Sequence, residues 1–259
     1  MTVVNIFLDF DFPSFLLILI NKPLWITSHD AISAVKKHLR APARDNLSEE
    51  ERQAGIKPPK IKIWHAGTLD PLASGLLIAA TDKDTKQLHT LTGQDKEYEA
   101  IIDFSQSSDT RDMGYRKEIS AVDMSLYDTI SLDTITTLLD SIIGTHDLPL
   151  TPFSAKKING KKLYEYAREW NPIFLTVPMT VYGYEILDYN FPLLKISLRV
   201  GTGTYIRSIA HRLGIKCWWD ALLTSLLRTS IADYSLSHIT KNPNQIALWD
   251  DKQIEYIIL

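Results

Sequence analysis

The chain is short of the residues that build disulfide frameworks and metal sites. Its 259 residues include one cysteine, Cys217, which excludes an intramolecular disulfide and indicates a reducing, cytoplasmic setting. The seven histidines are scattered without the spacing of metal ligands, and no cofactor motif is present. We therefore expect neither a metal ion nor a cofactor.

Long apolar runs are also missing. The strongest run, Phe15 to Ile20, falls far short of the ~20 residues that a membrane span requires. No basic residue precedes it, and Asp9, Asp11 and Pro13 interrupt the sequence before it, unlike an export signal. We interpret the run as the first buried strand of the main domain, with residues 1–14 as an extension, and expect no membrane association.

The formal net charge of −3 provides no general attraction to nucleic acid, but the charges are unevenly distributed. Residues 36–62 hold eight basic and four acidic side chains, whereas residues 99–140 hold three basic and nine acidic ones. Residues 156–168 hold five basic side chains and one acidic one. A solvated surface is the alternative for this last cluster, but the interleaved Phe153, Tyr164 and Tyr166 favour RNA, because aromatic rings stack on exposed bases.

The order of the predicted elements favours an α+β fold rather than a doubly wound sheet. A helix is expected from Ser28, as its N-cap, to Pro42, and the charged residues 43–60 are expected to form an exposed insertion. Further strands are predicted over 75–80, 98–104, 176–188 and 193–200. Further helices are predicted near 83–91 and 131–141, and over 204–213 with its end at Gly214.

The most informative segment is Trp64 to Leu77 (WHAGTLDPLASGLL), which is arranged around Asp70. Asp70 precedes a proline, which disfavours helical dihedral angles, and Gly67 and Gly75 allow the backbone to approach a bulky ligand closely. An apolar run of strand length follows. A carboxylate at the edge of a buried strand is a candidate nucleophile or base. The alternative is an Asp-Pro turn with no chemical role.

Several segments, in the same order along the chain, resemble the TruB family of pseudouridine synthases. His65 to Gly75 (HAGTLDPLASG) resembles the family's His-x-Gly-x-Leu-Asp-Pro-x-Ala-x-Gly core. The other matching segments are LLILINKPLWITS (16–28), KEYEA (96–100), SDTRD (108–112), FSA (153–155), NGKKLYEYAR (159–168) and GTYIRS (203–208). The resemblance runs from about residue 15 to about residue 235 and covers nearly the whole chain.

The resemblance implies the pseudouridine synthase fold, a mixed and largely antiparallel central sheet flanked by helices and loops around an RNA cleft. It implies that Asp70 is the catalytic nucleophile in the isomerisation of uridine to pseudouridine, without a metal or cofactor. His65 would take the position that the target base leaves when it flips out of its stack. Tyr98 would stack on that base, and Arg207 would keep Asp70 charged and oriented.

Other residues are carried over in the same way. Tyr205 and Leu227 would complete the base pocket. Backbone hydrogen bonding is the alternative role for His65, and core packing is the alternative for Tyr98, Tyr205 and Leu227. The residues expected to contact RNA are Lys22, Lys86, Lys156, Lys157, Lys161, Lys162 and Arg168. For Lys22 and Lys86 a structural role is also open.

The chain departs from the family pattern at three places. Trp64 stands where many relatives have glycine, residues 227–229 read Leu-Arg-Thr instead of Leu-Arg-Arg, and the insertion at 43–60 borders the Asp70 loop. We expect a catalytic domain over 15–240 and a short tail over 241–259, which leaves no room for the PUA domain that many relatives carry.

The resulting expectation is a monomeric, cytoplasmic tRNA pseudouridine synthase that acts on uridine 55 and binds the T arm. A guide-RNA-dependent enzyme is disfavoured because such relatives hold their guide with a PUA domain. The alternative from another class is a non-catalytic RNA-binding or tRNA-folding protein that retains the fold.

Overall fold

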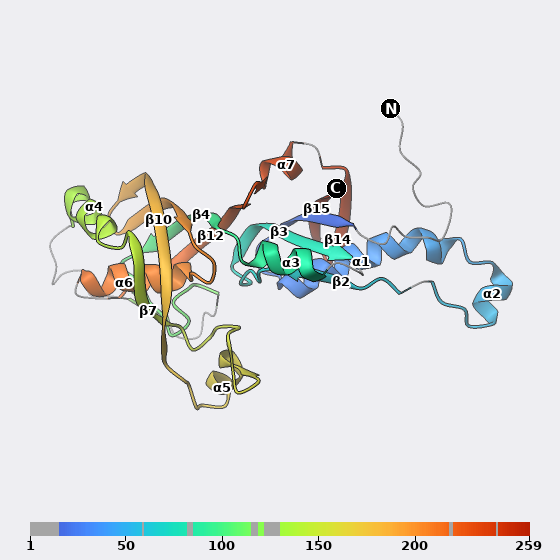
Figure 1. Cartoon of the computed structure of the whole chain (residues 1–259), viewed down its shortest axis with the longest axis horizontal. Coiled ribbons are helices and arrows are strands. Elements are labelled where there is room, and N and C mark those ends of the chain that lie inside the picture. Colours follow the sequence, from blue (N-terminus) through green and yellow to red (C-terminus); the bar gives the residue numbers. More distant parts are fainter. Residues whose placement is uncertain are drawn as a thin grey trace. The chain divides into compact units, whose positions relative to one another are not determined.

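The chain divides into two compact units (Figure 1). The computed structural model describes residues 16–58, 60–81, 85–114, 119–121, 130–217, 220–241 and 243–259, with only the backbone of residues 85–87. The first unit comprises Met1–Pro71, Gly75–Thr92 and Ser235–Leu259, and the second comprises Leu72–Ser74 and Gly93–Tyr234. The extension expected at residues 1–14 lies outside the described residues.

An antiparallel sheet with the strand order β14-β15-β1-β3 forms the frame of the first unit, and β2 pairs with β3. The strands are β1 (Leu17–Lys22), β2 (Ile63–Ala66), β3 (Ala73–Thr81), β14 (Gln245–Trp249) and β15 (Lys252–Ile258). The buried strand expected at the Phe15–Ile20 run is confirmed as β1. Residues 241–259, expected to be a short tail, instead include both β14 and β15.

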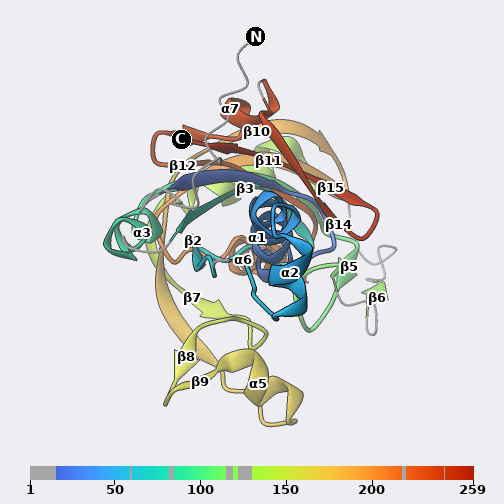
Figure 2. The same ribbon diagram turned by 90° about the vertical axis from the view of Figure 1, so that its right-hand side faces the viewer.

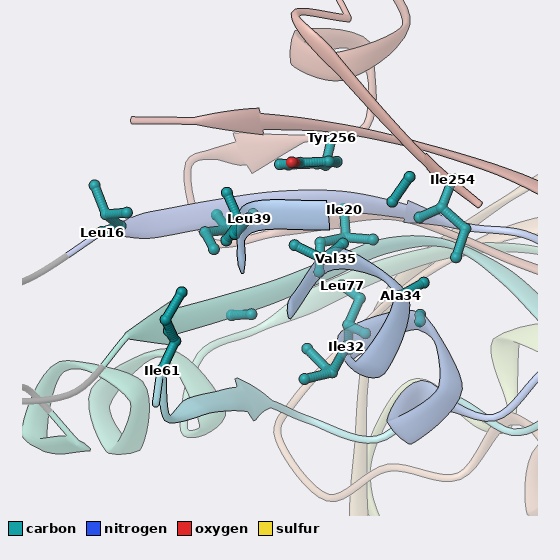
Figure 3. Packing of buried hydrophobic residues seen from close by; sticks show 14 of the residues in the cluster. Leu16, Ile20, Ile32, Ala34, Val35, Leu39, Ile61, Leu77, Ile254 and Tyr256 are labelled. Carbon is teal, nitrogen blue, oxygen red and sulfur yellow. The ribbon is translucent and has the colours of Figure 1, made fainter. Parts of the chain in front are cut away.

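Helix α1 (Ser28–Asp45) builds the core of this unit against the sheet (Figure 3). Ile32, Val35 and Leu39 recur at helical spacing and are buried together with Ile20 of β1 and Tyr256 of β15. The remaining helices of the unit are α2 (Glu49–Gln53), α3 (Thr85–Thr92) and α7 (Ser237–Thr240). Because α2 has no buried residue, the expected exposure of the 43–60 insertion is confirmed there.

Both predicted ends of α1 were wrong. Thr27, not Ser28, is the N-cap, because the Thr27 hydroxyl accepts from the Asp30 amide and the Asp30 carboxylate accepts from the Thr27 amide. The helix also continues through Pro42 to Asp45. A proline in the last turn removes one amide donor but leaves its own carbonyl able to accept, here from the amide of Asn46 at 3.0 Å.

The second unit is built on antiparallel strands in the order β12-β4-β11-β10-β7. These strands are β4 (Lys96–Asp103), β7 (Gly144–Leu150), β10 (Leu175–Asn190), β11 (Leu193–Val200) and β12 (Leu222–Ile231). Shorter strands are β5 (Gln106–Ser107), β6 (Ser120–Ala121), β8 (Lys157–Ile158), β9 (Lys161–Lys162) and β13 (Tyr234–Ser235). The helices are α4 (Leu132–Asp140), α5 (Leu163–Arg168) and α6 (Ile206–Lys216). The predicted α+β class is confirmed.

Helix α6 does not end at Gly214 as predicted, but continues to Lys216. A Cβ atom at Gly214 would lie 2.5 Å from both the Ala221 nitrogen and the Asp220 carbonyl carbon. The glycine therefore permits close backbone packing inside the helix instead of a left-handed turn at its end.

Within the described residues, no helix combines the length and apolar character needed to span a membrane.

Candidate active site

The Asp70 loop joins β2 to β3 in the first unit, and its backbone is held on both sides of Asp70. The Ser28 hydroxyl accepts from the Leu69 amide at 2.9 Å and donates to the Leu69 carbonyl at 3.1 Å. On the other side, the Trp25 amide donates to the Pro71 carbonyl at 2.7 Å. Leu69 is 3% exposed and also anchors the loop in the interior. These contacts fix the position from which the half-buried Asp70 side chain starts.

Gly67 gives the loop its turn. Its φ of 73° lies in the left-handed region, where a residue with a Cβ atom is disfavoured. This conformation lets the chain reverse between His65 on β2 and Asp70 in the following loop, so the two candidate residues lie on either side of one turn. His65 is half-buried and faces Ala79 of β3 in the strand register. Its expected role in base flipping remains a prediction.

The turn at residues 23–27 contacts the Asp70 loop through the hydrogen bond from Trp25 to Pro71. The Lys22 ammonium donates to the carbonyls of Pro23 at 3.0 Å and Ile26 at 2.7 Å, and the Lys22 side chain has no exposed surface. A fully buried lysine has no surface with which to contact RNA, so the expected RNA contact at Lys22 is corrected to a structural role. Lys86 lies on α3, and its side chain is outside the described residues.

Ser28→Ala should lower the free energy of unfolding by about 1–3 kcal/mol, because it leaves two buried backbone groups of Leu69 without their partner. Urea denaturation of both proteins measures the difference. Ser141→Ala removes an exposed hydroxyl at the end of α4 and is the matched control, with an expected change within about 0.5 kcal/mol. Equal stabilities of the Ser28 and Ser141 variants would show that the hydroxyl of Ser28 does not hold the loop.

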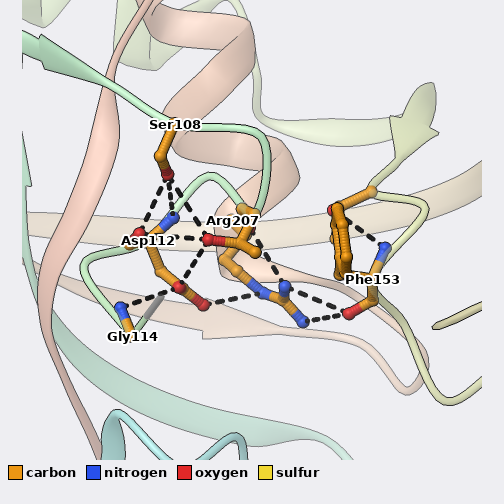
Figure 4. Close-up of polar contacts among 7 residues, drawn as sticks. Ser108, Asp112, Gly114, Phe153 and Arg207 are labelled. Atoms are coloured by element: carbon orange, nitrogen blue, oxygen red, sulfur yellow. Dashed lines mark hydrogen bonds and ion pairs between the residues drawn. The ribbon is translucent and has the colours of Figure 1, made fainter. Parts of the chain in front are cut away.

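Arg207 organises the second unit at the start of α6 (Figure 4). Its guanidinium donates to the Thr110 carbonyl at 3.1 Å and to the Phe153 carbonyl at 3.3 Å, and its Nε lies 3.6 Å from the Asp112 carboxylate. Arg207 is 3% exposed and Asp112 is 6% exposed. One buried cation on α6 therefore contacts two segments that are far apart in the sequence, residues 110–112 and Phe153. The expected pairing of Arg207 with Asp70 remains a prediction.

Asp112 in turn fixes its own loop. One of its carboxylate oxygens accepts from the Thr110 hydroxyl and from the Gly114 amide, both at 3.0 Å. The Ser108 hydroxyl donates to the Asp112 carbonyl at 2.9 Å and accepts from the Asp112 amide at 3.2 Å. The Ser-Asp-Thr-Arg-Asp segment is thus a network around a buried carboxylate. The segment resembles a family motif in sequence, but only the structure identifies Asp112 as the partner of Arg207.

Tyr98 on β4 is buried and lies directly opposite Arg228 on β12. Leu226 faces Ala100 two residues along β4, so Leu226 and Arg228 share the side of the sheet to which Tyr98 points. Leu227 faces Glu99 and therefore points to the opposite side. The grouping of Leu227 with Tyr98 in one pocket was wrong, because side chains alternate along a strand. Leu226 is the leucine that the register places with Tyr98.

Lys96 is a further buried cation on this side of β4, two residues before Tyr98. Burial and the neighbouring Arg228 lower the pKa of Lys96 to about 8. The Lys96 ammonium donates to the Gln94 carbonyl at 2.6 Å. Tyr205, the other expected pocket residue, is half-buried at the N-cap of α6, where its carbonyl accepts from the Ser208 amide at 2.9 Å.

The basic hairpin, defined as residues 156–168, consists of β8, β9 and α5 and projects from the strands of the second unit (Figure 2). Asn159 and Gly160 make its turn with φ values of 50° and 81°, which is the behaviour expected of an Asn-Gly pair. Lys157 lies opposite Lys162 across the two strands. Like charges in this position repel each other, and an anion bound between them would relieve that repulsion.

Tyrosine rings position the cations of the basic hairpin. Lys161 lies over Tyr166 with its Nζ 4.7 Å from the ring centroid, and it forms an ion pair with Glu169. Lys162 and Arg168 lie over Tyr164 at 5.2 Å and 5.0 Å. The hydrogen bond to the Tyr164 hydroxyl raises the pKa of Lys162. The hairpin therefore presents a pre-arranged group of positive charges.

Known proteins share much of the sequence of this chain. The family described as TruB family pseudouridylate synthase (N terminal domain) matches residues 52–206. The tRNA pseudouridine synthase B of Phocaeicola vulgatus is 32% identical over 241 residues, which are 92% of this chain and 94% of that protein. The enzyme of the same name from Parabacteroides distasonis is 34% identical over 229 residues, covering 87% and 89% of the two chains.

Solved structures show a similar fold. The structure of a Cbf5-Nop10-Gar1 complex matches with a TM-score of 0.57 and 23% identity, and that of an H/ACA RNP bound to a substrate RNA with 0.56 and 23%. Each match covers 86% of this chain and about half of the other chain, 50% and 49%. At this identity the likeness concerns the fold alone. The family match and the near full-length relatives show that this chain belongs to the TruB family of pseudouridylate synthases.

Proposed function

We propose that the protein isomerises uridine to pseudouridine in tRNA, at uridine 55 of the T loop, with Asp70 as the nucleophile. The observation that carries the proposal is the carboxylate of Asp70 on a loop whose backbone is fixed by Ser28 and Trp25. Relatives that match nearly their whole length are named tRNA pseudouridine synthase B, which supports tRNA as the substrate.

The reaction needs a single well-placed nucleophile. It breaks the bond between N1 of the base and C1′ of the ribose, rotates the base and forms a bond between C5 and C1′. C5 loses its hydrogen as a proton and N1 gains a proton, so substrate and product contain the same atoms. Asp70 attacks either the base or the sugar, and each route needs the ionised carboxylate. No step requires an external oxidant or reductant.

The other site residues bind and position the base. The target base has to leave its stack, and His65 fills the position that it vacates. Tyr98 stacks on the flipped base, with Leu226 and Arg228 on the same side of their sheet. Arg207 holds the Asp112 loop in place through the contacts described above. Tyr205, at the N-cap of α6 close to Arg207 in sequence, completes the base pocket.

The basic hairpin binds the T arm. Lys156, Lys157 and Arg168 are exposed, and Lys161 and Lys162 are partly exposed, so their charges are accessible to phosphates. The tyrosine rings hold three of these cations, which lowers the entropy lost when they bind RNA. The protein acts as a monomer in the cytoplasm in this proposal.

Lys161→Glu with Lys162→Glu should weaken tRNA binding by at least about 10-fold and lower the slope of log affinity against log salt by about 2, because two phosphate contacts are lost. Fluorescence anisotropy with labelled tRNA at several salt concentrations measures both quantities. Lys195→Glu with Lys216→Glu, two changes outside the hairpin, is the control for the change in net charge. An affinity equal to that of the control at low salt would remove the hairpin from the RNA interface.

Tritium release tests the proposed reaction. Unmodified tRNA transcript labelled at C5 of its uridines should release tritium when the protein is added, because C5 loses its hydrogen as the new bond forms. Mapping the modified position should give uridine 55. A transcript with uridine 55 replaced by cytidine is the matched control and should release no tritium. Binding of the tRNA without any release would favour a non-catalytic RNA-binding protein.

A further inference from the structure

The segment that leads into β2 carries two cations and an indole on one side. Lys60, Lys62 and Trp64 are exposed, whereas Ile61 between them is 2% exposed and belongs to the core of the first unit. This alternation is that of an extended chain with one side buried. We refer to Lys60, Lys62 and Trp64 as the basic strip.

Trp64 is the unusual member of the basic strip. Its side chain is 58% exposed, although an indole gains free energy when it is buried. Trp64 lies on β2 and is opposite Ala80 of β3 in the antiparallel register. If this position contacted only solvent, a polar side chain would be more favourable there than an indole. An exposed indole beside two ammonium groups is instead suited to stack on a nucleobase while the cations contact phosphates.

The sequence around the basic strip is rich in lysine. Residues 54–69 include Lys57, Lys60 and Lys62 and no carboxylate. The Arg40 guanidinium donates to the Pro58 carbonyl at 3.1 Å, which adds a fourth cation at the beginning of this segment. Helix α3, which packs against β2, has no acidic residue in its sequence. This stretch of sequence is therefore basic although the whole chain has a net negative charge.

The basic strip is continuous with the Asp70 loop. Trp64 precedes His65 directly, and β2 ends at Ala66, where the loop begins. An RNA strand whose target nucleotide lies at Asp70 would thus meet the strip with its neighbouring nucleotides.

We infer that the basic strip binds the tRNA strand next to the target nucleotide, with Lys60 and Lys62 on consecutive phosphates and Trp64 stacked on an unpaired base. This inference rests on the proposed function. The contact lies in the first unit and is separate in sequence from the basic hairpin, which belongs to the second unit. The basic strip would be a second group of cations, besides the basic hairpin, with which this acidic chain binds tRNA.

Charge reversal tests the phosphate contacts. Lys60→Glu with Lys62→Glu should weaken tRNA binding about 10-fold or more and lower the salt slope by about 2. Lys241→Glu with Lys252→Glu changes the net charge equally and is the matched control. Lys252 lies on β15, which is separated from β3 by β1, whereas β2 pairs directly with β3. The control should change the affinity less than about twofold.

Substitution of Trp64 tests stacking. Trp64→Ala should weaken binding about 5-fold or more without changing the salt slope, and Trp64→Phe should recover most of the loss because the ring is retained. In single-turnover tritium release, each strip variant should require more tRNA for half-maximal rate but reach the wild-type rate at saturation. This pattern separates binding by the strip from a role in the chemical step.

The outcomes distinguish this inference from the proposed function. If the wild type binds and modifies tRNA while the strip variants have the same tRNA affinity as the Lys241 and Lys252 control, the inference is wrong and the proposed function stands. A protein partner would then be the candidate that binds the strip. If the wild type binds tRNA without turnover, the strip is still tested by affinity. A wild type that binds no tRNA overturns both.

Discussion

Asp70→Asn should reduce pseudouridine formation by at least about 10⁴-fold while leaving the affinity for tRNA within about threefold of the wild type. The amide keeps the size of the carboxylate but cannot act as the nucleophile. The loop contacts of Ser28 and Trp25 involve only the backbone of Leu69 and Pro71, so they are retained in the variant. Single-turnover tritium release and anisotropy measure the two effects separately.

Two further variants make this result specific. Asp109→Asn removes an exposed carboxylate outside the Asp70 loop and should leave turnover unchanged. Asp70→Ala should be as inactive as Asp70→Asn, and it excludes slow deamidation of the asparagine as a source of residual activity. Normal turnover by Asp70→Ala would mean that another group performs the chemistry and would remove Asp70 from the proposed role.

The second large effect is expected at Arg207. Arg207→Met should lower the free energy of unfolding by about 3–5 kcal/mol, because the variant leaves the Asp112 carboxylate buried without its cation. It also removes the donors to the carbonyls of Thr110 and Phe153. Urea denaturation measures the change. Arg212→Met, five residues further along α6 and only partly buried, is the matched control, with an expected change within about 0.5 kcal/mol.

A double-mutant cycle isolates the contribution of the contact between Arg207 and Asp112. Asp112→Asn removes the charge but keeps the hydroxyl and amide partners within reach. The double variant should lose less free energy of unfolding than the two single variants lose together, by about 1–3 kcal/mol. The reason is that the neutral asparagine no longer needs the cation. Strict additivity would show that Arg207 and Asp112 do not stabilise each other.

The sequence predicted several of the longer strands and helices because hydrophobic period and length are local properties. The predicted strands over 176–188 and 193–200 correspond to β10 and β11, and the helix near 131–141 corresponds to α4. Two of the errors lie at the ends of helices. Thr27 and Ser28 both carry a hydroxyl, and only the capping contacts with Asp30 show which one starts α1. Gly214 is typical of a helix end, but here it is required by the Asp220–Ala221 backbone that packs against it.

The sequence by itself determined the family and the candidate nucleophile, because the dense pattern around Asp70 is a property of consecutive residues. Only the tertiary structure decided what Ser28, Lys22 and Leu227 do. Ser28 bonds a residue 41 positions away, Lys22 is enclosed by its own turn, and the register of β4 and β12 turns Leu227 away from Tyr98. Burial and strand register depend on segments distant in the sequence, so no local pattern contains them.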